Sequence, residues 1–240
     1  MNTEKNILVD RTNFAALTVQ SNDLAETLSD GQALLKIERF ALTANNITYA
    51  ATGDFLKYWD FFPTLPGKGI IPVWGFAEVL ESNCDEVEVG ARFYGFYPMS
   101  SHLIVEPGSI TPGSFVDASA HRSHLSLIYN QYIRCDRDPM YQVDQEASQM
   151  VLRPLFTTSF LLDDMFGDAA NFGAKTLVLT SASSKTAIGM AQGLADDESA
   201  PTVVGITSRP NYDFVKSLGC YDEIICYDEL DAIDESTTAV

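Results

Sequence analysis

The sequence predicts an α/β protein of two parts. Residues 177–227 alternate between short apolar runs and helical patterns, which predicts a parallel sheet connected by helices. In the first 110 residues, short strands are separated by closely spaced turn residues, which is typical of a small β-barrel-like domain. A chain of 240 residues can bury two cores. We therefore expect one domain over 1–150 and a second over 151–240.

The second part follows a β-α-β-α-β order. Its expected elements are strand Leu177–Thr180, helix Thr186–Ala195, strand Thr202–Thr207, helix Tyr212–Leu218 and strand Glu223–Tyr227. Such a run implies a parallel sheet with right-handed crossovers and helices packed on it. It corresponds to the first half of a Rossmann fold, which binds ligands at the carboxyl ends of its strands.

The turn after the first of these strands is the expected phosphate contact. Ser183 or Ser184 can cap the following helix, and backbone N–H groups and the helix dipole point at one spot. The usual glycine fingerprint is missing, because Ala182, Lys185 and Ile188 stand where glycines are expected. The missing glycines also argue against a nucleotide-triphosphate loop. The predicted cofactor-binding residues of this turn are Ser181, Ala182, Ser183, Ser184, Lys185 and Thr186.

The end of the second strand indicates which dinucleotide is bound. An Asp or Glu that would take the ribose 2′-hydroxyl of NAD is absent, and Ser208, Arg209 and Asn211 follow Thr207 instead. The planar guanidinium of Arg209 suits a 2′-phosphate, which favours NADP(H) over NAD(H). The alternative is that Arg209 only neutralises nearby acidic residues.

The first 110 residues contain the expected strands of the barrel. They lie at 31–40, 77–80, 91–97 and 102–105, with Pro-Gly and Ser-Asn turns between them. Three segments, 44–53 (Ala-Asn-Asn-Ile-Thr-Tyr-Ala-Ala-Thr-Gly), 72–79 (Pro-Val-Trp-Gly-Phe-Ala-Glu-Val) and 89–95 (Val-Gly-Ala-Arg-Phe-Tyr-Gly), follow in a familiar order.

In these segments the chain resembles the GroES-like catalytic domain of the medium-chain dehydrogenase/reductase superfamily, on its zinc-free quinone-oxidoreductase side. The block Tyr58-Trp-Asp-Phe-Phe-Pro63 and the turn 181–187 are similar, more narrowly, to a branch of that superfamily labelled as a domain of unknown function. The resemblance covers nearly the whole chain. It implies a GroES-like β-barrel followed by a partial Rossmann sheet with helices on both faces, and hydride transfer that needs no metal.

The resemblance also implies that no zinc is bound. Zinc-dependent members carry a cysteine near Asn45, a Gly-His-Glu near 73–77 and a four-cysteine lobe, and this chain has none of these. His121 and His124 are three residues apart and could share a helix face. No nearby cysteine or well-placed carboxylate completes a metal-binding set with them.

Tyr49 is the candidate catalytic residue. A phenol can donate a hydrogen bond to a carbonyl oxygen that gains charge as hydride arrives. Asn45 and Asn46 could orient substrate or nicotinamide through their amides. The alternative is that Tyr49 is an ordinary buried aromatic and the asparagines make turns.

The middle of the chain is the least informative part. Residues 111–150 are richer in aromatic and basic residues, and the sequence does not decide between a packing segment and one that shapes a substrate pocket. Residues 150–166 predict a helix, with Pro154 in its first turn or at a break. In the superfamily this helix faces the cofactor, and the resemblance puts Thr158 at that place.

Composition restricts the partners. A net charge of −18 argues against nucleic acid and anionic membranes, which need a basic face. The N-terminus lacks the pattern of a secretory signal, and four widely spaced cysteines indicate free thiols, so a cytoplasmic protein is expected. From 231 onward only ten residues remain, with 239–240 resembling the start of a fourth strand. We expect a fragment of a longer protein that forms a homodimer at full length.

Two functions from different classes follow. The first is a zinc-independent, NADP(H)-dependent oxidoreductase that acts on a quinone, an enone or a related small carbonyl compound. The second is a catalytically degenerate nucleotide-binding sensor or scaffold, which the altered glycine motif favours.

Overall fold

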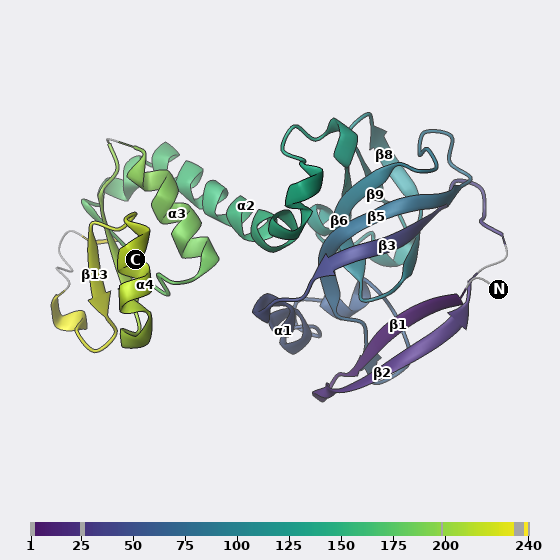
Figure 1. Ribbon diagram of the computed structural model, residues 1–240, viewed down its shortest axis with the longest axis horizontal. Coiled ribbons are helices and arrows are strands. Elements are labelled where there is room, and N and C mark those ends of the chain that lie inside the picture. The colour runs from purple at the N-terminus through teal and green to yellow at the C-terminus, as the bar shows by residue number, and fades with distance from the viewer. Residues whose placement is uncertain (1–2, 25–26, 198, 233–237, 240) are drawn as a thin grey trace. The chain divides into compact units, whose positions relative to one another are not determined.

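The computed structural model describes residues 3–24, 27–197, 199–232 and 238–239. The chain divides into two compact units, Met1–Val151 and Leu152–Val240, which we call unit 1 and unit 2. Figure 1 shows the strand-rich unit 1 in purple to teal and unit 2 in green to yellow.

Unit 1 contains an antiparallel sheet of seven strands in the order β7-β3-β5-β6-β10-β9-β8, which curls into part of a barrel (Figure 1). Its strands are β3 (Ala33–Ala41), β5 (Pro72–Ser82), β6 (Arg92–Pro98), β7 (His102–Val105), β8 (Pro107–Thr111), β9 (Ser114–Asp117) and β10 (Gln131–Arg134). The strands expected at 31–40, 77–80, 91–97 and 102–105 are confirmed as β3, β5, β6 and β7.

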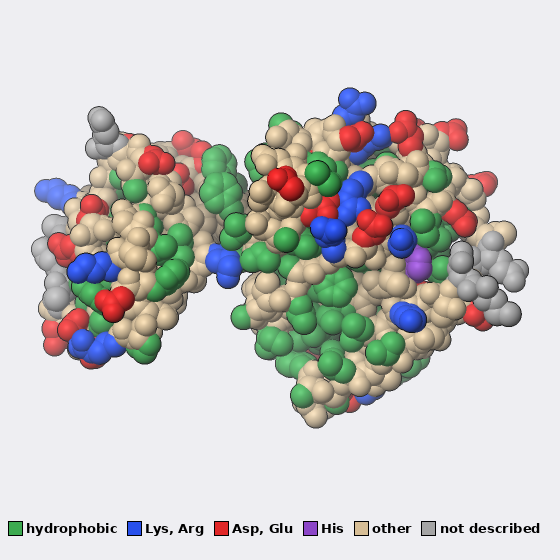
Figure 2. All heavy atoms as spheres, in the orientation of Figure 1, with side chains coloured by type: hydrophobic (Ala, Val, Ile, Leu, Met, Phe, Trp, Pro, Cys, Tyr) green, Lys and Arg blue, Asp and Glu red, His purple; other side chains and the backbone are tan. Residues whose placement is uncertain are grey.

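A second sheet of unit 1 has the order β2-β1-β4, with β1 (Thr3–Asp10), β2 (Asn13–Asp23) and β4 (Lys68–Gly69). The β1–β2 hairpin is absent from the sequence-based expectations. Leu17 and Val19 on β2 are 61% and 66% exposed, so this strand lacks the regular alternation of a half-buried strand. Figure 2 shows apolar side chains gathered on the lower part of unit 1, in the region of α1 and the β1–β2 hairpin of Figure 1.

Helix α1 (Ala44–Ala51) joins β3 to the aromatic block, and its Ala50 belongs to the buried core of unit 1. Short 3₁₀-helices make up much of the remaining chain of this unit: η1 (Tyr58–Asp60), η2 (Ala120–Arg122), η3 (Leu127–Tyr129), η4 (Cys135–Arg137) and η5 (Val143–Gln145). The core beneath them is rich in aromatic rings, including Trp59, Phe61 and Phe96.

Unit 2 is a parallel sheet in the order β13-β12-β11-β14, the 3-2-1-4 order of a Rossmann fold. Its elements are β11 (Thr176–Leu179), α3 (Lys185–Ala195), β12 (Thr202–Thr207), α4 (Tyr212–Leu218), β13 (Glu223–Cys226) and β14 (Thr238–Ala239), with η6 (Ala170–Gly173), η7 (Arg209–Asn211) and η8 (Leu230–Ala232). The predicted fold class and the β-α-β-α-β run are confirmed. The expected fourth strand is present at Ala239, and Val240 lies outside the described residues.

Helix α2 (Glu146–Asp168) begins in unit 1 and continues into unit 2. The expectation for Pro154 was wrong, because this residue lies at the ninth position of an unbroken helix of 23 residues. Proline removes one backbone donor there, and the packing of the apolar side chains Leu162 and Phe166 against the core of unit 2 stabilises the helix in compensation. None of the helices in the described part of the chain is long and apolar enough to cross a membrane.

Candidate functional site

Tyr49 lies on α1 with its ring buried and its hydroxyl held by two donors. The Nδ2 of Asn45, one helical turn earlier, donates to the Tyr49 hydroxyl at 2.9 Å, and the Nε1 of Trp74 on β5 donates to it at 3.3 Å. Tyr49 is 6% exposed, and burial raises the pKa of its phenol. The hydroxyl therefore stays protonated at neutral pH while both its acceptor positions are used.

Asn46 has a different environment from Asn45. Its side chain is 3% exposed, its Oδ1 accepts the backbone N–H of Thr43 at 2.7 Å, and its Nδ2 donates to the carbonyl of Pro72 at 2.8 Å. These bonds cap α1 and attach it to β5. Asn46 thus fixes the helix that carries Tyr49.

Two further phenols surround Tyr49. The Tyr58 ring lies 4.6 Å from the Tyr49 ring, and the Tyr58 hydroxyl is 3.2 Å from the hydroxyl of Tyr129. The pKa of Tyr129 is raised, mainly by burial and to a smaller extent by the hydrogen bond with Tyr58. Sequence analysis missed Tyr129, because its segment, 111–150, has no periodic pattern that shows which of its aromatics meet α1.

Arg122 organises the segment that carries Tyr129. Its guanidinium is fully buried and donates to Asp117 Oδ2 at 2.8 Å, Asn130 Oδ1 at 2.9 Å, the Tyr132 hydroxyl at 3.0 Å and the Tyr129 carbonyl at 2.9 Å. Three rings also lie within 6 Å of the guanidinium carbon, those of Phe61, Phe62 and Tyr132. A buried arginine with all these partners is a structural anchor.

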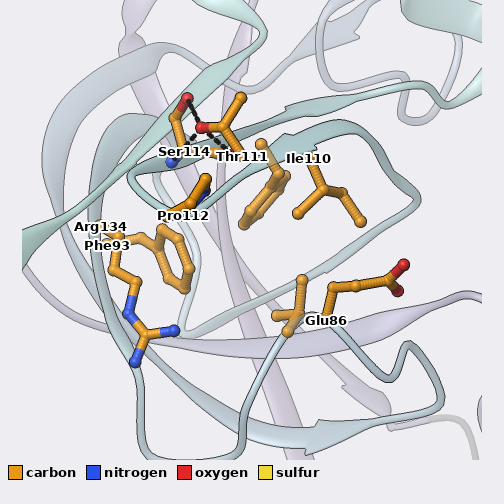
Figure 3. A pocket seen from close by; sticks show the side chains of 9 residues that line it. Glu86, Phe93, Ile110, Thr111, Pro112, Ser114 and Arg134 are labelled. Atoms are coloured by element: carbon orange, nitrogen blue, oxygen red, sulfur yellow. Dashed lines mark hydrogen bonds between the residues drawn. The ribbon is translucent and has the colours of Figure 1, made fainter. Parts of the chain in front are cut away.

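Unit 1 also has a cavity of about 330 Å³ between the loop near Val87 and the β8–β9 hairpin (Figure 3). Phe93, Phe115 and Ile110 form apolar walls, while Arg134 at the rim is paired with Glu88 and Asp136. The cavity shares no lining residue with the Tyr49 cluster, so we place no chemistry there.

In unit 2, the predicted turn connects β11 to α3. Ser184 is the N-cap of α3, and its side chain accepts the backbone N–H of Ala187 at 3.3 Å. The first N–H groups of a helix have no partner within it, so those of Lys185 and Thr186 point from the end of α3. The Lys185 side chain is exposed, and no carboxylate pairs with it in the described part of the chain.

Three other residues of the turn form hydrogen bonds within unit 2. Ala182 is buried, with its N–H bonded to the carbonyl of Ile206 at 2.9 Å. Asn211 Nδ2 donates to Ser183 Oγ at 3.1 Å, which joins the ends of β11 and β12. Ser181 has a φ of 51°, and its N–H donates to the Tyr227 hydroxyl at 2.8 Å. Ser208 is the half-buried N-cap of η7.

Arg209 is exposed at the end of β12 and pairs with two acids that follow β13. Its Nε donates to Asp228 Oδ2 at 2.8 Å and its Nη2 to Glu229 Oε1 at 3.0 Å. These two hydrogen bonds raise the pKa of Arg209, and the bond from Arg209 lowers the pKa of Asp228. The pairing with nearby acids that sequence analysis weighed for Arg209 is present.

Helix α2 meets the turn through Ser159. Its Oγ donates to the carbonyl of Thr186 at 2.8 Å, and Gly189 on α3 leaves room for it. Thr158, the residue that the resemblance selected, is exposed and donates to the Pro154 carbonyl within α2. The neighbouring Ser159 was missed because sequence alone does not fix the rotation of α2.

The potential metal ligands gather elsewhere. Cys226, Asp228 and Glu229 offer three ligand atoms within 4.8 Å of one another, but both carboxylates bind Arg209. His121 and His124 lie separately, against the Phe61 carbonyl at 3.2 Å and Asp60 at 3.5 Å. All four cysteines are free thiols.

The chain is similar to several solved structures. CurA from Vibrio vulnificus is 16% identical with a TM-score of 0.58, over 96% of this chain and 59% of CurA. The quinone oxidoreductase from Coxiella burnetii is 16% identical with a TM-score of 0.53, over 97% and 66% of the two chains. The Etr1p/NADP/crotonyl-CoA complex is 15% identical with a TM-score of 0.54, over 95% and 62%; Etr1p of Candida tropicalis is also known as part of the mitochondrial 2-enoyl thioester reductase Etr1p/Etr2p heterodimer.

At these identities the similarity shows the fold, and the chain spans about three fifths of the length of CurA and Etr1p. No curated protein matches the sequence. A half-barrel followed by a 3-2-1-4 parallel sheet is the fold of the medium-chain dehydrogenase/reductase superfamily. The chain belongs to the family described as protein of unknown function (DUF2855), whose model matches residues 40–240. The expected resemblance is thereby confirmed.

Proposed function

We propose that the protein is a zinc-independent, NADP(H)-dependent oxidoreductase that reduces a quinone, an enone or a related small carbonyl compound by hydride transfer. In this proposal residues 1–150 bind the substrate and residues 151–240 hold the cofactor. The protein would act in the cytoplasm, apart from nucleic acid and membranes, and as a homodimer when part of a longer chain. The observation that carries the proposal is the environment of the Tyr49 hydroxyl.

The Tyr49 hydroxyl is arranged as a hydrogen-bond donor. The indole N–H of Trp74 can only donate, so the phenolic oxygen must accept that bond. With Asn45 as the second donor, the one remaining function of the hydroxyl is to give its proton, and no described residue accepts it. A donor oriented in this way stabilises a carbonyl oxygen that gains negative charge as the neighbouring carbon is reduced.

Several groups of unit 2 fit a dinucleotide. The N–H groups at the start of α3 and the exposed ammonium of Lys185 suit a pyrophosphate, and Arg209 lies at the strand end where a 2′-phosphate is expected. When bound, the nicotinamide supplies the hydride. Ser181, Ala182, Ser183, Ser184, Thr186, Ser208 and Asn211 would shape the site, and Thr158 is kept as a weaker candidate contact. NADP bound to Etr1p, which has the same fold, supports this choice.

Independence from zinc is supported by the segment around Asn45, which lacks the cysteine that zinc-dependent members carry there. In unit 1 Asn45 is used to hold Tyr49, and Asn46 holds α1 to β5.

The test is the Tyr49→Phe variant in an assay of NADPH oxidation with a panel of quinones and enones. Loss of the donor should lower kcat by about 100-fold or more and leave the Kd of NADPH unchanged. Tyr212→Phe is the matched control, because this tyrosine lies on α4 and its hydroxyl has no hydrogen-bond partner among the described residues. If Tyr49→Phe behaves like Tyr212→Phe, Tyr49 is not the donor.

A second function is favoured by a different observation: the Ser181 N–H and the Arg209 guanidinium are already bonded to groups of the chain. A nucleotide-binding sensor or scaffold that has lost its chemistry would tolerate this. A thermal-shift screen with NADPH, NADH and ATP separates the two, since a bound ligand raises the apparent stability. Binding of NADPH without turnover of any substrate would favour the sensor.

A further inference from the structure

Three consecutive residues follow β13: Tyr227, Asp228 and Glu229. They contact the Ser181 N–H and the Arg209 guanidinium, two groups of unit 2 that could bind the phosphates of a dinucleotide. Tyr227 contacts Ser181 in the turn after β11, and the two acids contact Arg209, the second residue after β12. All three strands end at the same edge of the parallel sheet, where this fold binds its ligands.

The Tyr227 contact uses a backbone donor of the phosphate turn. The Ser181 N–H, which follows β11 by two residues, donates to the Tyr227 hydroxyl at 2.8 Å, and the Ser181 Oγ lies 3.3 Å from the same oxygen. A phosphate oxygen bound at this turn would need the same N–H. Tyr227 is 46% exposed, so it can move away without opening the core.

The acidic contact uses the guanidinium edge of Arg209. Nε and Nη2 form a fork that matches a carboxylate or a phosphate, and here one N–H goes to Asp228 and the other to Glu229. The side chains are 62%, 59% and 50% exposed, so these bonds are weak and exchangeable. The two carboxylates carry one more charge than Arg209 neutralises, which opposes a 2′-phosphate at the same place.

We infer that Tyr227–Glu229 is an internal competitor for the phosphate groups of the cofactor. The two acids compete with the 2′-phosphate and so determine how far the site prefers NADPH over NADH. Tyr227 competes with the pyrophosphate that both cofactors share. This inference rests on the proposed function, because it requires a dinucleotide at this edge of the sheet.

The test measures the Kd of NADPH and NADH for the full chain by nicotinamide fluorescence. Asp228→Asn with Glu229→Gln should tighten NADPH about fivefold and change NADH by less than about twofold. Tyr227→Phe keeps the ring and removes the acceptor, and should tighten both cofactors about threefold. The control pair, Asp196→Asn with Glu223→Gln, removes the same charge at exposed positions on the opposite edge of the sheet and should change neither.

The outcomes separate the inference from the proposed function. If NADPH binds the wild type, and the Asp228→Asn/Glu229→Gln and Tyr227→Phe variants bind it equally or more weakly, the inferred competition is wrong and the reductase proposal stands. If the control pair lowers the Kd of NADPH as much as Asp228→Asn with Glu229→Gln does, the effect is one of net charge, and the inferred competition is again wrong. If neither cofactor binds the wild type or any variant, both the cofactor assignment and the inference fail.

Discussion

Replacing Arg122 by methionine should strongly destabilise unit 1. Arg122 is 0% exposed and its partner Asp117 is 2% exposed, so the substitution leaves a buried carboxylate oxygen without its cation. Asn130 Oδ1 and the Tyr129 carbonyl lose their donors as well. Breaking a buried ion pair by removing one partner costs about 3–5 kcal/mol.

The assay is urea unfolding followed by tryptophan fluorescence. Both tryptophans of the chain, Trp59 and Trp74, lie in unit 1, so the signal reports on that unit. For a unit of this size the loss corresponds to a Tm lower by about 10 °C. Arg134→Met is the control, because the partners of Arg134 are exposed and their loss should cost less than about 1 kcal/mol.

A double-mutant cycle identifies the cause. Asp117→Asn with Arg122→Met removes both charges, so the double variant should be more stable than the sum of the single losses predicts, by at least about 1 kcal/mol. Additive losses, or an Arg122→Met variant within about 0.5 kcal/mol of the wild type, would refute the reasoning.

Two further predictions concern other parts of the chain. The hydroxyl and backbone N–H of Thr12 lower the pKa of Asp10 from 3.8 to about 2. The ionised Asp10 therefore stabilises the folded state fully above pH 3.8, and this stabilisation is lost as the pH falls from 3.8 to about 2. The difference in urea midpoint between wild type and Asp10→Asn should therefore shrink over that interval, and a constant difference would contradict it. In Gly189→Ala the new Cβ would lie 2.7 Å from the Ser159 Oγ, which should destabilise unit 2 by about 1–3 kcal/mol by calorimetry. Gly167→Ala on the open side of α2 should be neutral or stabilising, and equal effects would exclude the close contact as the cause.

The second half of the chain was the more predictable from sequence. Its strands are short apolar runs between clear breaks, and Gly219, with a φ of 69°, ends α4 where the pattern stops. As a result, the helices and strands predicted between residues 177 and 227 agree with the structure to within one residue at each end, whereas the helix predicted at 150–166 extends over Glu146–Asp168.

The first half was less predictable because its structure depends on contacts between distant residues. Arg122 is a charged residue in a buried position, which composition alone does not predict. The hydroxyls of Tyr58 and Tyr129 meet across 71 residues of sequence. Sequence reasoning selected Tyr49 and Arg209 by residue type and position, but the partners that define their chemistry come from the tertiary structure.

The proposed function requires the protein to pass a hydride from NADPH to a carbonyl compound. The most direct test is to incubate the protein with NADPH deuterated at the transferring position and a panel of quinones and enones, and to analyse the products by mass spectrometry. We expect a reduced product that carries the deuterium, and the Tyr49→Phe variant should form it much more slowly. Tight binding of NADPH with no deuterium in any product would contradict it and favour the sensor.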